Sequence, residues 1–311
     1  MSTMQVIALI LAAGSVLIAA IAVPRSSRSS PVRSFSRSVN LAVTAEVDRT
    51  VLRRVQARSL SFAGGLVLAA VVLMGLGLAG VEPGATTGIV TVLVVYGSVA
   101  LCIAVSAGAG RPWVPEGTPR MARVGAARIQ DYVPAFELVG ARALCGLAVL
   151  ACIGSAITAG ASGSGAVAAW WAGYAAIVVA IAVAWELNAR RVLRRSVPAG
   201  STQQLAWNDA LRASVLRDTL TLPLTAGFFG AFAGPLHVLT ELPLPGWIAA
   251  AVGGAVFLLL VAAVLVLIPI ALLVKPGRHY QRRLWPELAA APADAAGPAA
   301  PAASSAHGGA R

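Results

Sequence analysis

Residues 201–220 read STQQLAWNDALRASVLRDTL, and an apolar segment follows them without a break. Ser201 and Gln204 have the spacing of a capping box, which satisfies the first free N–H groups of a helix locally. Trp207 and Leu211 are four residues apart, so they share one face of that helix. The stretch therefore predicts a polar helix that leads into a membrane span, and the rest of the chain repeats this arrangement less clearly.

The apolar segment that follows, residues 219–239, is rich in proline and glycine. Proline frees backbone carbonyls inside a membrane helix, and interrupted spans are where transporters build their sites. Two of the glycines also have G-x-x-x-G spacing, which is typical of helix packing. The sequence allows two interpretations of these prolines and glycines, a transport pathway or a helix-packing surface. The residues are Pro223, Gly227, Gly230, Gly234 and Pro235.

The composition of the whole chain is that of a membrane protein. Of the 311 residues, 58% are hydrophobic and 12% are charged, whereas soluble domains carry about 25% charged residues. Basic residues outnumber acidic ones by 24 to 12, and Lys275 is the only lysine. The arginines lie in short loops beside apolar segments, where they set topology and meet anionic lipid headgroups. No loop combines a folded basic domain with interleaved aromatic residues, so we expect no nucleic-acid binding.

Seven apolar segments are long enough to cross a hydrocarbon core of roughly 30 Å. The first could alternatively be a cleaved signal peptide, but no basic residue precedes it and a basic run follows it, so we expect an uncleaved anchor. Short links join the second segment to the third and the fourth to the fifth, which predicts antiparallel neighbours. The predicted spans are residues 4–23, 60–81, 88–107, 143–161, 165–187, 219–239 and 246–274.

The distribution of basic residues predicts the orientation. With the N-terminus outside, all 24 Lys and Arg residues fall on the inner side or at its boundary, and the outer connections contain none. Because the Lys and Arg bias of short loops sets orientation, we predict an all-α, polytopic transmembrane helix bundle of about seven spans, N-out and C-in. A re-entrant sixth segment, which would give six spans, is the alternative. We expect a multi-pass protein of the cytoplasmic membrane.

This layout divides the chain into four parts. Residues 1–23 form an N-terminal transmembrane anchor, and residues 24–59 form a cytoplasmic Arg/Ser-rich linker that ends in an amphipathic helix. Residues 60–274 form a six-span helical domain with cytoplasmic loops 108–137 and 188–218. Residues 275–311 form a cytoplasmic tail, first basic and then Ala/Pro-rich and disordered. An arginine precedes spans two, four and six, so spans two to seven form three predicted helical hairpins. Common topology and internal duplication are both possible explanations of this repeat.

Arginines at the inner ends of the spans are candidate lipid or topology anchors, because the long stem can bury while the guanidinium reaches the headgroups. These are Arg58, Arg142, Arg190, Arg191, Arg194, Arg195, Arg212 and Arg217. The expected partners are the lipid bilayer with its anionic headgroups, and either another membrane protein or a second copy of the chain.

The spans contain no Asp, Glu, Lys or His away from their ends. Buried ionisable groups mark proton relays and ion sites, so the sequence argues against a pump or a proton-coupled transporter. The cysteines and histidines lack metal-ligand spacing, and we expect no metal and no cofactor. The inner side carries carboxylates that are each expected to pair with an arginine: Glu116, Asp131, Glu137, Glu186, Asp209 and Asp218.

The segment DALRASVLRD, residues 209–218, resembles segments of uncharacterised multi-pass membrane proteins of actinobacteria, as do the Ala/Gly richness and the preference for Arg over Lys. The resemblance covers the last two spans and implies no activity. We expect a non-enzymatic structural or interaction component of the membrane. The alternatives are a permease-like transporter of a neutral or amphipathic solute, using the Pro/Gly-broken sixth span, and an enzyme acting on a lipid at the inner face.

Overall fold

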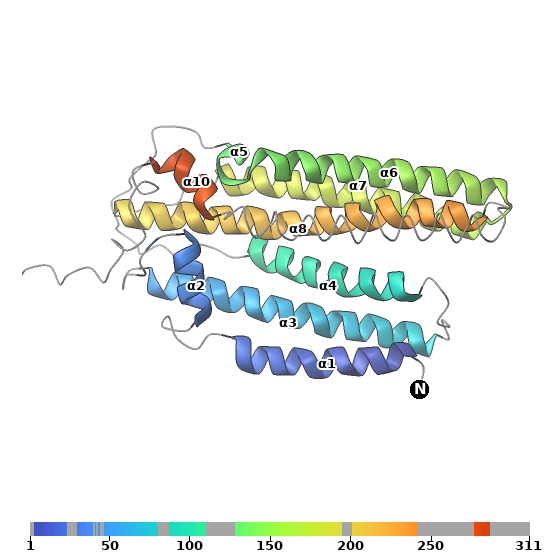
Figure 1. Cartoon of the computed structure of the whole chain (residues 1–311), viewed down its shortest axis with the longest axis horizontal. Helices are drawn as coiled ribbons and strands as arrows, with labels where there is room; N and C mark the ends of the chain where they lie inside the picture. The colour runs from blue at the N-terminus through green and yellow to red at the C-terminus, as the bar shows by residue number, and fades with distance from the viewer. Residues whose placement is uncertain are drawn as a thin grey trace, which may run out of the picture.

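The structure is a computed structural model that describes residues 3–23, 30–39, 41, 43, 47–79, 87–109, 128–194, 201–241 and 277–286. These residues form helices and short connections, and no β-strand is present among them. Long helices run alongside one another as a bundle, and short helices lie at one end of it (Figure 1). The prediction of an all-α helix bundle is confirmed for the described part of the chain.

The long helices are α1 (Thr3–Ala22), α3 (Asp48–Leu78), α4 (Thr87–Ala109), α6 (Ala135–Ala161), α7 (Gly165–Arg194) and α8 (Thr202–Glu241). The short helices are α2 (Ser30–Val39), α5 (Ile129–Tyr132) and α10 (Gly277–Leu284).

Five of the long helices are long and apolar enough to cross a membrane, and α4 contributes a shorter apolar stretch, Thr91–Ala107. The described structure is therefore compatible with an integral membrane protein. The seventh predicted span, residues 246–274, lies outside the described residues. The count of about seven spans and the orientation stay predictions.

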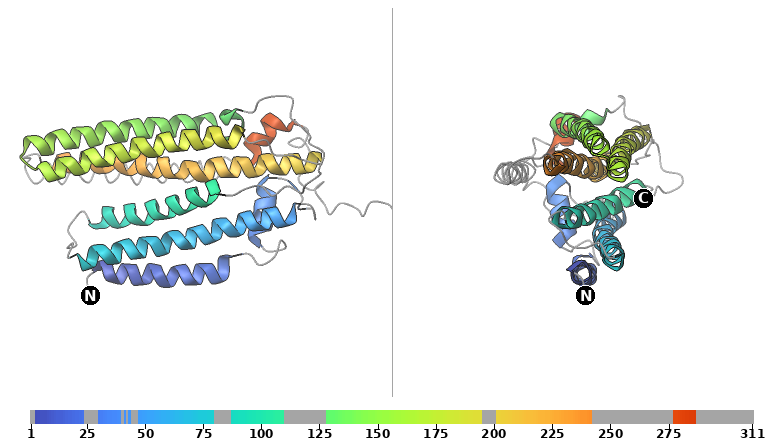
Figure 2. Two further views of the ribbon diagram at one scale, coloured as in Figure 1. Left: turned by 180° about the vertical axis from the view of Figure 1, so that it is seen from behind. Right: turned by 90° about the vertical axis from the view of Figure 1, so that its right-hand side faces the viewer.

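Helix α8 lies in the middle of the bundle. On one side it contacts α6 and α7, and on the other it contacts α4. Helix α4 packs on α3, and α3 packs on α1, so the first half of the chain forms a row of helices beside α8 (Figures 1 and 2). The tight turn between α6 and α7 contains Gly163 with a φ of 82°, a conformation that residues with a side chain rarely adopt. As predicted, α3 pairs with α4 and α6 with α7 as antiparallel neighbours.

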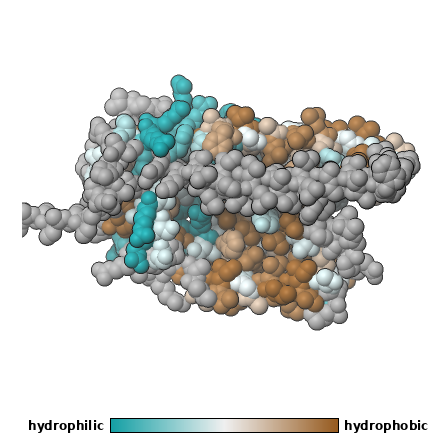
Figure 3. All heavy atoms as spheres, viewed as in Figure 1, coloured by the Kyte–Doolittle hydropathy of each residue, from teal (hydrophilic) through white to brown (hydrophobic). Residues whose placement is uncertain are grey.

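The bundle has an apolar body and one polar end. Large apolar side chains such as Leu9, Val71, Leu150 and Ile177 are exposed along the long helices, as expected for surfaces that face acyl chains. Hydrophilic residues gather at the end where α2 and α10 lie (Figure 3). We call this the polar end and define it as α2, α5, α10, residues 201–220 and the adjoining ends of α3, α6 and α7, which are residues 48–58, 135–142 and 185–194.

The largest buried cluster lies at the polar end and is centred on α8. Trp207 and Leu216 are fully buried there. Side chains from many other elements pack around them, including Val32 of α2, Val51 of α3, Leu138 of α6, Trp185 of α7 and Tyr280 of α10. The stretch 201–220 is thus the core of this end of the molecule.

Helix α8 corrects one prediction. It runs for 40 residues through Pro223 and Pro235, so the sixth span is not broken, and residues 202–241 contain no re-entrant turn. Each proline removes one N–H donor and so leaves the carbonyl four residues earlier without its helical partner, but the helix continues through both positions. Side chains of neighbouring helices contact other carbonyls of α8. The thiol of Cys145, for example, donates to the carbonyl of Pro223 at 3.3 Å. Composition alone does not show such donors, because they come from another helix.

Two further elements differ from the expected layout. The amphipathic helix expected at the end of the linker and the second span form one helix, α3, of 31 residues. The basic part of the C-terminal tail contains α10, in which Tyr280 is buried. Residues 287–311 lie outside the described residues.

Candidate functional site

The polar end brings together five of the six carboxylates predicted on the inner side. Each of the five contacts an arginine, as expected from the sequence. Glu116 lies outside the described residues. Four of these contacts join different helices, whereas the contact of Asp209 with Arg212 lies within α8, and together they form the candidate site.

Asp218 of α8 binds Arg54 of α3. The Nη2 atom of Arg54 lies 2.7 Å from Oδ2 of Asp218, and the two side chains are only 12% and 8% exposed. Arg58 approaches the other carboxylate oxygen at 3.6 Å, and the hydroxyl of Ser214 lies 3.4 Å from Oδ2. Both oxygens of Asp218 therefore have a cationic partner, and α3 is tied to α8.

Asp209 is the most deeply buried carboxylate among the described residues, at 1% exposure. The hydroxyl of Tyr132 donates to its Oδ1 at 2.8 Å, and the indole N–H of Trp285 donates to its Oδ2 at 3.0 Å. Arg212 lies 4.0 Å from Oδ1. Asp209 thus joins α8 to α5 and to the residue that follows α10.

Burial and the nearby charge of Asp209 raise the pKa of Tyr132 to about 12. Burial contributes most, because a phenolate has little water around it in this position. The hydroxyl therefore keeps its proton at neutral pH and acts as a fixed donor to Asp209.

Two more ion pairs link α6 to its neighbours. Arg217 of α8 donates through Nε and Nη2 to the two carboxylate oxygens of Glu137, at 3.0 and 2.6 Å. Arg142 donates to Oε1 of Glu186 on α7, through Nε at 2.8 Å and through Nη2. The first pair is a bidentate arginine–carboxylate contact, which is geometrically specific. The second is more exposed to solvent, since Arg142 is 57% exposed.

Helix α10 is held at the polar end by contacts with α2 and α5. The amide of Gln281 donates to the backbone carbonyl of Val39. Arg283 lies 3.7 Å from Asp131, and the ring of His279 contacts the chain of α5. The sequence analysis identified none of the α10 residues, although the aromatic residues within the basic run were a usable signal.

The structure divides the predicted arginine anchors into two groups. One group contacts carboxylates and consists of Arg58, Arg142, Arg212 and Arg217. The other group is exposed on α7 and forms no ion pair within the described part of the chain; it consists of Arg190, Arg191 and Arg194. Arg195 lies outside the described residues.

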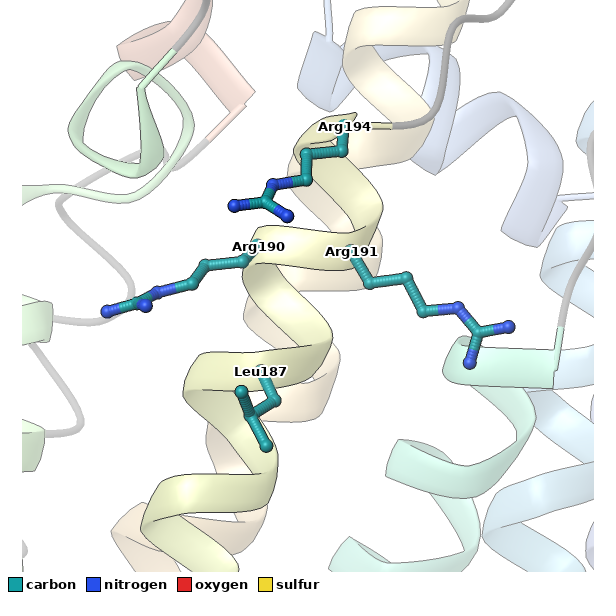
Figure 4. Close-up of a pocket in the computed structure, with 4 residues that line it drawn as sticks. All are labelled: Leu187, Arg190, Arg191 and Arg194. Atoms are coloured by element: carbon teal, nitrogen blue, oxygen red, sulfur yellow. The ribbon is translucent and has the colours of Figure 1, made fainter.

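The exposed group lines an open hollow of about 410 Å³ together with Leu187 (Figure 4). A second open hollow of about 370 Å³ lies on α2 and is lined by Ser30, Arg33, Ser34 and Arg37. The sequence analysis did not single out Arg33 or Arg37, although their four-residue spacing placed them on one helix face.

The glycines predicted as pathway or packing residues face α6. A Cβ atom at Gly227 would lie 3.0 Å from the backbone nitrogen of Cys145, and one at Gly230 would lie 2.8 Å from the Cβ of Ala148. A Cβ at Gly234 would lie 3.1 Å from the carbonyl group of Ala151. The distance at Gly230 is shorter than side chains show, and the other two are tighter than most Cβ contacts, so the glycines allow the two helices to approach closely.

Side chains of α6 and α7 donate hydrogen bonds to backbone carbonyls on the same stretch of α8. The donor–acceptor pairs are Cys145–Pro223 at 3.3 Å, Tyr174–Ala226 at 3.1 Å, Cys152–Gly230 at 3.9 Å and Ser155–Gly234 at 2.9 Å. Pro235 is exposed and faces away from this contact. The cysteines thus act as small packing residues with weak donors.

Within the described residues, no group of three or more His, Cys, Asp or Glu side chains is placed to hold a metal ion. Comparisons with protein families, with curated proteins and with solved structures give no match to this chain.

Proposed function

We propose that the protein is a non-enzymatic component of the cytoplasmic membrane whose polar end forms a rigid platform on the inner side. The observation that carries this proposal is that the carboxylates of the polar end hold its helices together. Asp131, Glu137, Glu186 and Asp218 each pair with an arginine from another helix, and Asp209 joins three segments through hydrogen bonds.

The partners that the carboxylate oxygens already have within the protein support a structural role. General acid–base catalysis needs a carboxyl group that can exchange a proton with a substrate. In Glu137 and Asp209, both oxygens already accept hydrogen bonds from the protein. In Asp218, one oxygen accepts from Arg54, and Arg58 lies 3.6 Å from the other. These groups are therefore placed to hold helices together, and the platform that they form suits binding of another membrane protein or a second copy of the chain.

The apolar half of α8 supports the same proposal. Gly227, Gly230 and Gly234 bring α8 close to α6, and such close packing is how helices associate in lipid, where burial of apolar surface gives little driving force. A solute pathway along these glycines would require the two helices to separate. The positive-inside bias supports placing the polar end in the cytoplasm.

A charge exchange between Glu137 and Arg217 tests the proposal. We expect Glu137→Gln and Arg217→Gln each to lower the thermal unfolding temperature of the purified full-length protein. The double variant Glu137→Arg/Arg217→Glu should recover most of that loss, because the pair still joins α6 to α8. It should also retain the set of membrane proteins that copurify with the wild type.

Lipid analysis of cells that carry the exchanged pair separates this role from catalysis. A catalytic carboxylate moved from α6 to α8 would no longer meet its substrate, and a lipid substrate would accumulate. We expect the lipid profile of these cells to match that of the wild type. Accumulation of a single lipid species, with normal stability of the variant, would contradict the proposal.

A further inference from the structure

Helix α7 carries a basic face that the ion pairs of the polar end leave unused. Arg190, Arg191 and Arg194 are exposed and form no ion pair within the described part of the chain. The nearest acid on the same helix, Glu186, is bound by Arg142 of α6. No carboxylate among the described residues therefore neutralises the positive charge of this face.

The exposed face of α7 changes from apolar to basic within one helical turn. Val183 and Leu187 are 52% and 60% exposed, and Arg190 is the next residue along the same face. The opposite face, which includes Trp185 and Ala189, is buried against the rest of the molecule. A ligand that lies along the exposed face would meet apolar side chains first and guanidinium groups next.

The three guanidinium groups surround the end of this apolar face. Arg190 and Arg194 extend to one side of α7 and Arg191 to the other, with Leu187 one turn earlier (Figure 4). The three positions span about 6 Å along the helix axis at 1.5 Å per residue. Together with Leu187 they line the hollow of about 410 Å³. Arginine suits phosphate because its planar fork of donors matches two phosphate oxygens.

We propose that this face of α7 binds an anionic phospholipid. The arginines hold the headgroup phosphate, and an acyl chain lies along Leu187 and Val183. The sharp junction of apolar and basic surface favours a lipid over a soluble anion, because a soluble anion would gain nothing from the apolar part. This inference goes beyond the platform role and does not depend on it.

Titration with phospholipid tests the site. Full-length protein in detergent is titrated with phosphatidylglycerol or with phosphatidylcholine, and binding is followed by the rise in unfolding temperature. We expect phosphatidylglycerol to stabilise the wild type at much lower concentration than phosphatidylcholine does. Since each arginine near a headgroup contributes about a fivefold change in affinity, Arg190→Gln/Arg191→Gln/Arg194→Gln should weaken phosphatidylglycerol binding about a hundredfold.

A matched variant controls for net charge. Arg49→Gln/Arg53→Gln/Arg282→Gln removes three other arginines that are exposed and form no ion pair within the described residues. We expect it to bind phosphatidylglycerol within about threefold of the wild type, because its charges lie away from the site and are screened. An equal loss in both triple variants would overturn the proposal, as would wild-type binding by the α7 variant.

Two measurements on the wild type do not depend on any substitution. Inorganic phosphate at the same concentration should give little stabilisation, and a rise equal to that with phosphatidylglycerol would show a free-anion site and overturn the lipid assignment. Phosphatidylglycerol with a photoreactive group beside the headgroup should crosslink to residues 183–194. Crosslinking confined to other parts of the chain would also overturn the proposal.

Discussion

The two halves of α8 are held in the bundle by different interactions. From Thr202 to Leu220, the helix is fixed by long side chains, through the pairs of Asp209 and Asp218 and the buried Trp207. From Leu222 to Glu241, glycines allow the backbone of α8 to approach α6, and side chains of α6 and α7 donate to its carbonyls.

This difference fits the proposed position in a membrane, with a change of solvent near residue 220. Where water surrounds the structure, burial of large apolar side chains drives association, and charged pairs add geometric specificity. In lipid, apolar burial gives little driving force, so close packing and hydrogen bonds must act instead. The pairs Arg58–Asp218 and Arg142–Glu186 lie at the same transition, where the apolar stretches of α3, α6, α7 and α8 meet their polar ends.

The largest effect is expected when the buried ion pair of α8 loses one partner. Asp218→Leu leaves the guanidinium of Arg54 buried without its carboxylate, and we expect the free energy of unfolding to fall by about 3–5 kcal/mol. Unfolding in mixed micelles of detergent and dodecyl sulfate measures it. The double variant Arg54→Met/Asp218→Leu should recover much of the loss, because it removes the unpaired charge. Wild-type stability of Asp218→Leu would show that ion pairs do not hold this half of α8.

A side chain added where α8 lies closest to α6 tests how the second half of α8, residues 222–241, is held. Gly227→Leu would place atoms against the backbone of Cys145, and we expect a loss of about 2–3 kcal/mol in the same assay. Gly173→Leu on α7 is the matched control, because a Cβ there meets no atom within 4 Å. Equal stability of the two variants would mean that the close packing of α8 on α6 does not contribute to the fold.

A smaller effect is expected from the hydrogen bond between Tyr132 and Asp209. Tyr132→Phe removes one donor from a buried carboxylate that keeps Trp285, and we expect a loss of about 1–2 kcal/mol. The pKa of Tyr132 is raised from 10.0 to about 12, so this stabilisation is complete below about pH 10 and is lost as the pH rises through about 12. Tyrosinate absorbance and unfolding temperature, followed together against pH in wild type and variant, measure this. Identical alkaline profiles would contradict it.

Much of the helical layout could be predicted from apolar length alone. Residues 60–81 and 143–161 fall largely within α3 and α6, and short links predicted which helices pair. Helix α10 was not predicted, because its eight residues contain only two apolar side chains, Tyr280 and Leu284. Its position depends on contacts with α2 and α5 that are more than 140 residues away in the chain.

The division of the arginines into those that pair with a described carboxylate and those that do not could not be predicted either. The partner of Arg54 is 164 residues away, and the partner of Arg142 is 44 residues away, so sequence spacing gives no indication of either pair. The break expected at Pro223 was wrong, because the two prolines remove only two N–H donors from a 40-residue helix that packs against α4, α6 and α7. Local sequence indicates which groups need partners, and only the packing of helices determines which partners they obtain.

The smallest effect is expected for the exposed pair at the transition between the two regions. Arg142 is 57% exposed and Glu186 is 27% exposed, so we expect Arg142→Gln to cost less than about 1 kcal/mol and the cost to fall further with added salt. The same unfolding assay at low and high salt measures it. A loss above about 2 kcal/mol that salt does not reduce would mean that this pair is shielded from water. The boundary between water and lipid would then lie closer to the polar end than residue 142. The Arg142–Glu186 pair would in that case lie in the same lipid environment as the second half of α8.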